Sequence, residues 1–212
     1  DLHYPLRRQR QMCIRDRYET FCGMLQQVRD AGYQPPWIHL SNSAALFAHH
    51  LPECNLVRPG IVLYGALPSD AFAGRLDLRP VMSWRTHIYQ LKQVPAGTGV
   101  SYGHRFKAER PSVLAAIPVG YSDGYNRHLS GCGEVLVRGQ RAPVAGTVCM
   151  NWTMIDVSDI PGVRVGDRVT LLGRDGEDCI GAEELAEKTG TISYEIFCQV
   201  SKQIPRLYRD DG

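Results

Sequence analysis

The sequence lacks the features that mark several broad classes of protein. No apolar run approaches the ~18 residues that a transmembrane helix needs, and the N-terminus does not have the charged, apolar and small-residue order of a signal peptide. We therefore expect no membrane partner and a cytoplasmic location. Twenty-four basic residues nearly balance 22 acidic ones, and no basic face interleaved with aromatic residues is present. Nucleic-acid binding is therefore not expected.

Signals for metal sites and disulfides are also missing. The seven cysteines are odd in number and contain no Cys-x-x-Cys pair, which argues for a reducing compartment and against a disulfide framework or zinc site. The histidines are scattered, and none pairs with another ligand at metal spacing. Gly-x-Gly-x-x-Gly, P-loop and Gly-x-Ser-x-Gly motifs are absent as well. No metal is expected.

What is present is enough apolar material, 43% of 212 residues, for one large domain or two small ones. Residues 1–17 stand apart, because they follow neither a helical nor a strand period and carry five arginines. The string Met12-Cys-Ile-Arg-Asp-Arg17 looks like translated sequencing-adapter sequence. We interpret residues 1–17 as a non-native lead-in; the alternative is a basic disordered arm.

Residues 18–67 have the rhythm of a parallel α/β sheet or barrel. Apolar residues recur at helical spacing over residues 18–31, and Gly32 follows as a C-terminal stop. Two buried strands are predicted at 37–40 and 56–65, with a helix at 44–50 between them.

Beyond residue 68 the pattern changes to short strands with Gly, Pro or Asp between them, which suits a small antiparallel barrel or sandwich. Arg138-Gly-Gln140 and Arg174-Asp-Gly176 are hairpin signals. Two helices follow, one at 183–188 ended by Gly190 and one at 194–204. The change of pattern places a domain boundary near residues 68–80. The predicted strands are 81–94, 112–119, 133–137, 142–148, 154–157 and 168–172.

Ser43 and Arg58 are the first candidate site residues. Ser41-Asn-Ser43 lies between a predicted strand and a helix start, where outward backbone N–H groups favour an anion such as phosphate; a plain N-cap is the alternative. Arg58 is followed by Pro59 and Gly60, and a guanidinium at a buried strand edge needs a partner. Gly60 and Ile61 would bring backbone close to that partner, and a structural ion pair is the alternative.

Tyr102 lies in a turn flanked by glycines at 97, 99 and 103. A phenol titrates near pH ~10, so it can act as a general base only if cations or donors lower its pKa; a half-buried rim residue is the alternative. Tyr121 lies in a second Gly-flanked turn that could be a simple tight loop. Met150 follows Cys149 at a strand end, where core filling is the alternative.

Six motifs in order resemble the C-terminal part of the bacterial alanine racemase family, and the match runs from about residue 18 to the end. The motifs are His39-Leu-Ser-Asn-Ser-Ala-Ala45, Val57-Arg-Pro-Gly-Ile-Val-Leu-Tyr-Gly65, Val100-Ser-Tyr-Gly103, Gly120-Tyr-Ser-Asp-Gly124, Val148-Cys-Met150 and Thr191-Ile-Ser-Tyr-Glu195.

The resemblance implies an α/β + β fold. Residues 18–75 would be the last helices and strands of a (β/α)8 barrel, and residues 76–212 a mainly antiparallel β domain. It also implies a pyridoxal 5'-phosphate enzyme that acts as a head-to-tail homodimer and interconverts L-alanine and D-alanine, which supplies D-alanine for peptidoglycan.

Site roles follow from the same resemblance. Ser43, the backbone at Gly60 and Ile61, and Tyr194 would hold the cofactor phosphate. Arg58 would face the pyridine nitrogen and keep it unprotonated, which weakens the ring as an electron sink. Tyr102 would be the base on one face of the substrate α-carbon, acting across the dimer interface. Tyr121 would line the substrate entrance, and the Met150 N–H would meet the substrate carboxylate.

The sequence departs from the family in two ways. Asn151 stands where an aspartate commonly follows Cys-Met. The family lysine that forms the Schiff base and serves as the second base has no counterpart, because Lys92, Lys107, Lys188 and Lys202 lie in other contexts. We therefore expect a fragment that is inactive alone. The alternatives are a broad-specificity or serine racemase of the same family, and a non-catalytic β-barrel binding module.

Overall fold

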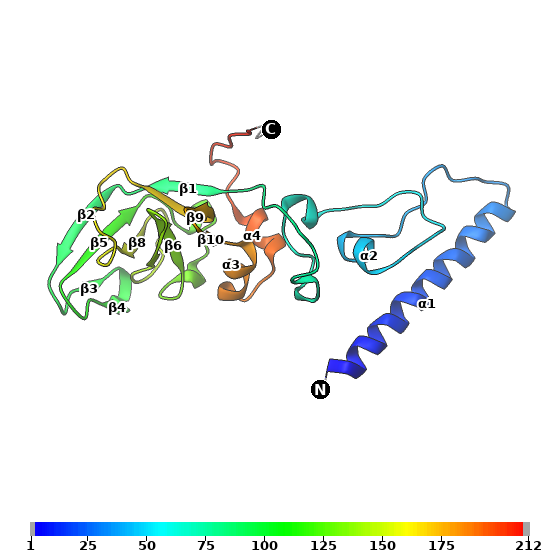
Figure 1. The fold of residues 1–212 in the computed structure, drawn as a ribbon, viewed down its shortest axis with the longest axis horizontal. Coiled ribbons are helices and arrows are strands. Elements are labelled where there is room, and N and C mark those ends of the chain that lie inside the picture. Colours follow the sequence, from blue (N-terminus) through cyan, green and yellow to red (C-terminus); the bar gives the residue numbers. More distant parts are fainter. Residues whose placement is uncertain (1–2, 210–212) are drawn as a thin grey trace. The chain divides into compact units, whose positions relative to one another are not determined.

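The computed structural model describes residues 3–209, and the side chains of residues 15–209. The described residues form two compact units, which divide between Leu63 and Tyr64 (Figure 1). Within residues 3–209, no helix has both the length and the apolar character that a membrane span requires.

The first unit begins with helix α1, His3–Asp30 (Figure 1). Residues 3–17 are helical although their sequence follows no helical period, so the alternative of a disordered arm is wrong for them. Arg, Gln, Leu and Met are good helix formers and need no apolar period to extend a helix, and Pro5 lies in the first turn, where proline is tolerated. The predicted stop is confirmed: Gly32 has a φ of +87°, and the Tyr33 N–H donates to the Val28 carbonyl at 3.2 Å.

The rest of this unit contains helix α2, Ser43–Ala48, and the 3-10 helix η1, Ile61–Tyr64. The strands predicted at 37–40 and 56–65 are wrong, since no strand occurs among the described residues up to 63. These segments still lie side by side, because the Leu56 N–H donates to the Ile38 carbonyl at 3.2 Å and the Arg58 N–H to the Ser41 carbonyl at 2.9 Å. Parallel strands are normally paired and covered on both sides, and these two segments make only a few backbone bonds to each other.

The second unit is built from antiparallel pairs only, so the predicted β-rich pattern is confirmed. The order β1-β9-β6-β7, with β10 beside β9, forms one sheet; β2-β5-β8 forms a second, and β3-β4 a small ribbon (Figure 1). The strands are β1 Trp84–His87, β2 Gln90–Val94, β3 Gly99–Val100, β4 Phe106–Lys107, β5 Ser112–Ile117, β6 Glu134–Val137, β7 Gln140–Pro143, β8 Thr153–Asp156, β9 Arg168–Asp175 and β10 Asp178–Ile180.

Turn residues fix the two predicted hairpins. Arg138 and Gly139 both have positive φ, +53° and +76°, as a two-residue turn between β6 and β7 requires. Gly176, with a φ of +62°, turns β9 into β10. The strand predicted at 142–148 is wrong beyond Pro143, because proline lacks the N–H that a ladder needs and Gly146 has a φ of +92°.

Helices and short 3-10 turns complete the unit. Gly190 ends α3 in the left-handed conformation, as predicted. The helix predicted at 194–204 is shorter than expected, because α4 ends at Gln199 and the Ser201 N–H donates to the Asp123 carbonyl at 2.9 Å. The elements are η2 Asp70–Phe72, η3 Tyr102–His104, η4 Tyr121–Asp123, η5 Arg127–Leu129, α3 Ala182–Thr189 and α4 Ser193–Gln199.

The units divide between Leu63 and Tyr64, a few residues before the boundary that the sequence pattern placed near 68–80. Two contacts attach residues 64–67, the first residues of the second unit, to its helices α3 and α4. The Tyr64 ring packs on Phe197 of α4 with ring centroids 5.5 Å apart, and the Leu67 N–H donates to Glu183 of α3 at 2.8 Å.

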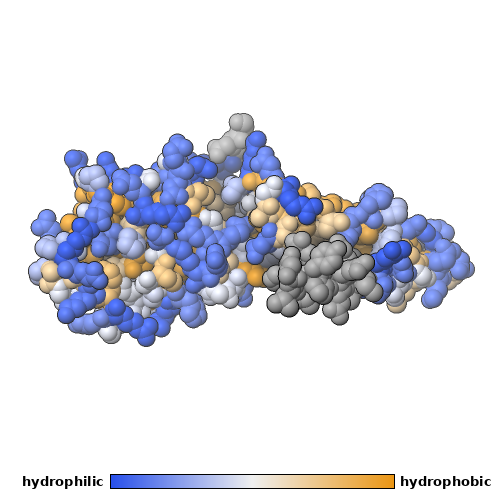
Figure 2. Space-filling model, turned by 60° about the horizontal axis from the view of Figure 1, so that its bottom comes forward, coloured by the Kyte–Doolittle hydropathy of each residue, from blue (hydrophilic) through white to orange (hydrophobic). Residues whose placement is uncertain are grey.

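Aliphatic side chains from both larger sheets and from α3 and α4 form the main core. Ile117 of β5, Leu136 of β6 and Leu171 of β9 are fully buried in it. A smaller apolar cluster, which includes Val100 and Ala145, lies beside η3. Hydrophilic residues cover most of the visible face of the β-rich unit, with small hydrophobic areas between them (Figure 2).

A half-buried ion network joins the β6–β7 hairpin to β10 and α3. Arg141 contacts Asp178 at 2.8 Å, Glu184 at 2.7 Å and Glu134 at 3.1 Å, and Lys188 contacts Glu134 at 2.9 Å. Hydrogen bonds from Lys188 and then Arg141 lower the pKa of Glu134. Arg141 and the Cys179 N–H lower the pKa of Asp178. The cations thus stabilise the ionised carboxylates of the folded state.

Arg141→Met is expected to destabilise the second unit by about 2 kcal/mol, because it removes charged hydrogen bonds to three carboxylates. The pH dependence should change too. The lowered pKa values stabilise the fold above the ordinary carboxyl values of 4.5 and 3.8, and this contribution is lost as pH falls through the lower folded values. Urea denaturation between pH 7 and pH 3 should therefore show a shallower pH dependence in the variant.

Arg110→Met is the control for this variant, since the Arg110–Asp159 pair at 2.6 Å is largely exposed and such pairs contribute little. Equal destabilisation by the two substitutions would contradict the assignment of the network.

Deletion of residues 1–17 is expected to leave the thermal unfolding midpoint unchanged. The side-chain hydrogen bonds that involve residues 15–17 stay within α1. Arg15 donates to the Glu19 carboxylate, and the Thr20 hydroxyl donates to the Asp16 carbonyl. Calorimetry of the full and shortened chains measures this, and a clear drop in the midpoint would show that the segment packs natively.

Candidate functional site

Ser43 and Gly60, 17 residues apart, come together in the first unit. The Gly60 N–H donates to the Ser43 Oγ at 2.8 Å, and Ser43 is buried. Asn42 is the N-cap of α2, accepting from the Ala45 N–H at 3.0 Å. The Ser43 hydroxyl is therefore not needed as a helix cap. Ile61 is buried directly after Gly60, so the structure groups Ser43, Gly60 and Ile61 as the sequence predicted.

Arg58 differs from expectation. It is exposed rather than held at a buried strand edge, and its Nη2 donates to the Leu40 carbonyl at 3.3 Å. No carboxylate lies within ion-pair distance of Arg58 in the described part of the chain. The structural ion pair considered from the sequence is thus not found, and the guanidinium can still bind an acceptor near Ser43 and Gly60.

In the second unit, the Tyr121 turn packs tightly on residues 149–150. The Tyr121 N–H donates to the Cys149 carbonyl and the Ser122 N–H to the Met150 carbonyl, both at 3.0 Å. A Cβ on Gly120 would lie 2.2 Å from the Cys149 oxygen, so only glycine permits this approach. Tyr121 and Met150 are both substantially exposed at this contact.

Tyr102 belongs to the same group of loops. Its side chain is 76% exposed on η3. The Thr147 hydroxyl donates to the Tyr102 carbonyl at 3.1 Å, and the Ser101 hydroxyl donates to the Thr147 carbonyl at 2.7 Å. Residues 147–150 therefore include Met150 and are hydrogen-bonded to the two turns that contain Tyr102 and Tyr121.

Tyr194 is the second residue of α4 and is partly exposed. The chain just after the other end of α4 is bonded to the Tyr121 turn, since the Ser201 N–H donates to the Asp123 carbonyl at 2.9 Å. Tyr194 thus shares a unit with Tyr102, Tyr121 and Met150, whereas Ser43, Arg58, Gly60 and Ile61 belong to the other unit.

The supporting side chains escaped the sequence prediction. Ser101 and Ser122 lie inside the motifs that drew attention to Tyr102 and Tyr121, so the motifs themselves could have indicated them. Thr147 precedes the Val148-Cys-Met150 motif, and nothing in its local sequence distinguishes it from an ordinary strand residue. Asn151, the departure from the family pattern, donates through Nδ2 to the Ser122 Oγ at 2.7 Å.

The residues of the first unit fit part of a phosphorylated pyridine cofactor. The Ser43 hydroxyl accepts from the Gly60 N–H and keeps its own proton to donate to a phosphate oxygen. Arg58 adds a cation that has no carboxylate partner among the described residues. An amine for the aldehyde is not part of this set, because residues 1–63 contain no lysine. Of the four lysines, Lys188 is engaged with Glu134.

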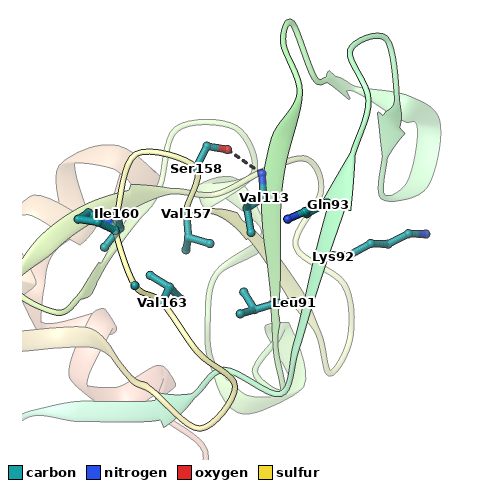
Figure 3. A pocket seen from close by; sticks show the side chains of 10 residues that line it. Leu91, Lys92, Gln93, Val113, Val157, Ser158, Ile160 and Val163 are labelled. Atoms are coloured by element: carbon teal, nitrogen blue, oxygen red, sulfur yellow. Dashed lines mark hydrogen bonds between the residues drawn. The ribbon is translucent and has the colours of Figure 1, made fainter.

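An open hollow of about 490 Å³ lies elsewhere in the second unit, between β2, β5 and residues 157–163 (Figure 3). Leu91, Val113 and Ile160 contribute apolar lining, and Ser158 uses its Oγ to accept the Val113 N–H at 2.8 Å. None of the predicted site residues lines this hollow.

Comparison with known proteins decides the family. Residues 4–68 match the family model of the alanine racemase N-terminal domain, and residues 81–208 match that of the alanine racemase C-terminal domain. The chain belongs to the alanine racemase family. The predicted family is confirmed. The alanine racemase from Geobacter sulfurreducens is 57% identical over 189 residues, which are 89% of this chain and 50% of that protein.

Solved alanine racemases have the same fold. The Bacillus anthracis enzyme with bound L-Ala-P is 38% identical, with a TM-score of 0.85. The match covers 92% of this chain and 50% of that enzyme's chain. The Streptomyces lavendulae enzyme is 35% identical with a TM-score of 0.87, over 94% and 52%. The predicted fold class is confirmed. The chain spans about half the length of these relatives.

Gly120→Ala is expected to separate the Tyr121 turn from residues 149–150, because its Cβ would overlap two backbone oxygens. Overpacking of this kind costs about 1–3 kcal/mol. Urea denaturation and faster amide exchange at Ser122 measure the effect. Gly181→Ala is the control, since its Cβ would meet a flexible Glu183 side chain at 3.3 Å. Unchanged exchange at Ser122 would contradict the tight contact.

Proposed function

We propose that this chain is the C-terminal part of a cytoplasmic, pyridoxal 5'-phosphate-dependent alanine racemase that interconverts L-alanine and D-alanine and so supplies D-alanine for peptidoglycan. The observation that carries the proposal is the grouping of Tyr102, Tyr121 and Met150 around residues 147–150. Family membership gives that grouping its chemical meaning.

Most of the cofactor-binding residues in this proposal belong to the first unit. Ser43, Gly60 and Ile61 hold the phosphate, and Tyr194 adds its phenol. The burial of Ser43 and its contact with Gly60 support this role. Arg58 donates to the pyridine nitrogen. Among the described residues its guanidinium makes one weak bond, to the Leu40 carbonyl at 3.3 Å, and its other N–H groups can serve this role. When bound, the cofactor supplies an electron sink that acidifies the substrate Cα–H.

The second unit handles the substrate. The Met150 N–H binds the substrate carboxylate; within residues 3–209 it makes no hydrogen bond that would compete. Tyr121 lines the substrate entrance. The Tyr102 Oη removes a proton from Cα on one face of the substrate, or delivers one there, as a positioned general base and acid.

Tyr102 acts on a second subunit in this proposal, so the working enzyme is a homodimer. The 76% exposure of Tyr102 fits a side chain that reaches beyond its own unit. The base for the opposite face is a lysine, and none is available in residues 1–63. This chain alone is therefore inactive.

Alanine is preferred over serine or a broad substrate range because the Bacillus anthracis neighbour was solved with bound L-Ala-P. A non-catalytic β-barrel module is disfavoured, since it leaves the match of residues 4–68 to the N-terminal domain and the Ser43–Gly60 contact without a purpose.

Tyr102→Phe is expected to lower racemisation by roughly 10²–10⁴-fold while cofactor absorbance is retained, because only the acid–base hydroxyl is lost. The test uses a chimera in which the N-terminal part of the Geobacter sulfurreducens enzyme, which this chain does not cover, is joined to the matched region of this chain. In deuterated solvent, α-proton exchange from L-alanine should fall far more than exchange from D-alanine, since the lysine still serves the D enantiomer.

Tyr89→Phe is the control for this substitution, because Tyr89 is an exposed phenol of the same unit with no assigned role. An equal loss for both enantiomers, or near-normal racemisation, would remove Tyr102 from the proposed role.

A further inference from the structure

The turn that carries Tyr102 has an unusual backbone. Ser101 has a φ of +61° and His104 a φ of +46°, although neither is glycine, and Gly103 between them has a φ of +72°. Residues with side chains rarely adopt positive φ, and such conformations persist only where the surrounding structure holds them. The orientation of Tyr102 therefore depends on contacts outside residues 101–104.

Thr147 provides one such contact. It is 3% exposed, and its hydroxyl donates to the Tyr102 carbonyl at 3.1 Å. Ser101 returns a bond, donating from its Oγ to the Thr147 carbonyl at 2.7 Å. The Tyr102 turn and the segment at Thr147 thus each donate one side-chain hydrogen bond to a backbone carbonyl of the other.

Close backbone packing leaves little room for adjustment here. A Cβ on Gly146 would lie 2.9 Å from the Val100 carbonyl oxygen and 2.9 Å from the Ser101 Cβ. Val100 and Ala145 belong to the same small apolar cluster. This packing fixes the backbone next to Thr147, so that the Thr147 hydroxyl can hold the strained turn.

We propose that Thr147 is a positioning residue for Tyr102. Its buried hydroxyl, together with the return bond from Ser101, keeps the strained turn in one conformation and presents the phenol in one orientation. This inference rests on the proposed function, in which Tyr102 moves the α-proton. Because proton transfer depends steeply on the placement of the base, a small displacement of the turn lowers the rate without altering the chemical groups present.

The first test follows backbone motion in the 212-residue chain. Thr147→Val keeps the shape of the side chain and removes the hydroxyl. It should raise amide exchange by about tenfold at His104, whose N–H donates to the Ser101 carbonyl of the turn at 3.4 Å. Thr147→Ser keeps the hydroxyl and should exchange at the rate of the unsubstituted chain. Thr153→Val is the matched control, since Thr153 is equally buried and donates to the Val119 carbonyl at 2.7 Å, away from this turn.

The second test measures kinetics in the chimera. Thr147→Val should lower kcat from L-alanine by about 10–100-fold with KM little changed, whereas Thr147→Ser and Thr153→Val should stay near the parent rate. If Thr147→Val does not fold, Ser101→Ala removes the return bond and should show the same pattern of faster exchange and lower kcat.

Unchanged exchange and unchanged kcat in both Thr147→Val and Ser101→Ala would overturn the proposal. An equal effect of Thr147→Val and Thr153→Val would also overturn it, because the hydroxyl would then serve stability alone. Faster exchange in Thr147→Val, combined with normal racemisation by Tyr102→Phe, would retain the support of the turn and refute the proposed function of Tyr102.

Discussion

The close contact of the Tyr121 turn with residues 149–150 is the constraint on which the candidate site of the second unit depends. Gly120 allows two backbones to meet at a separation that any side chain would prevent. Hydrogen bonds from Tyr121 and Ser122 then fix the register of that contact. Because residues 147–150 also bind the Tyr102 turn, one short segment determines the relative placement of three predicted site residues.

The β-rich unit keeps this segment rigid. Val148 is fully buried in the main core, and its N–H donates to the Ser130 Oγ at 3.0 Å. The ion network around Arg141 joins the β6–β7 hairpin to β10 and α3, away from the loops of the site. Loops on a well-packed sheet scaffold are a common way to combine precise placement with exposed chemical groups.

The two units contribute different chemistry. The first offers a buried hydroxyl, a backbone N–H and an exposed guanidinium, which suit an anionic, aromatic cofactor. The second offers exposed phenols and a backbone N–H that suit an amino-acid substrate. In the proposed function the exposed Tyr102 acts on a second copy of the chain, which is why that function requires a homodimer.

Much of this could be predicted from the sequence, because the relevant information is local. Glycines at 139, 176 and 190 mark turns and a helix end, since each of them has the left-handed backbone that glycine favours. Alternation of apolar residues indicates the antiparallel strands. The six ordered motifs were sufficient for the family and for the candidate residues Ser43, Arg58, Tyr102, Tyr121, Met150 and Tyr194.

Tertiary structure decided the rest. The segments at 37–40 and 56–65 have apolar strand-like sequences, yet strands form only when neighbours pair with them, and that pairing is not a local property. Arg58 is exposed for the same reason. Thr147 supports Tyr102 across 45 residues of sequence through one hydroxyl, and no local pattern marks such a bond. Contacts between distant segments depend on how close two backbones approach, which only the folded chain determines.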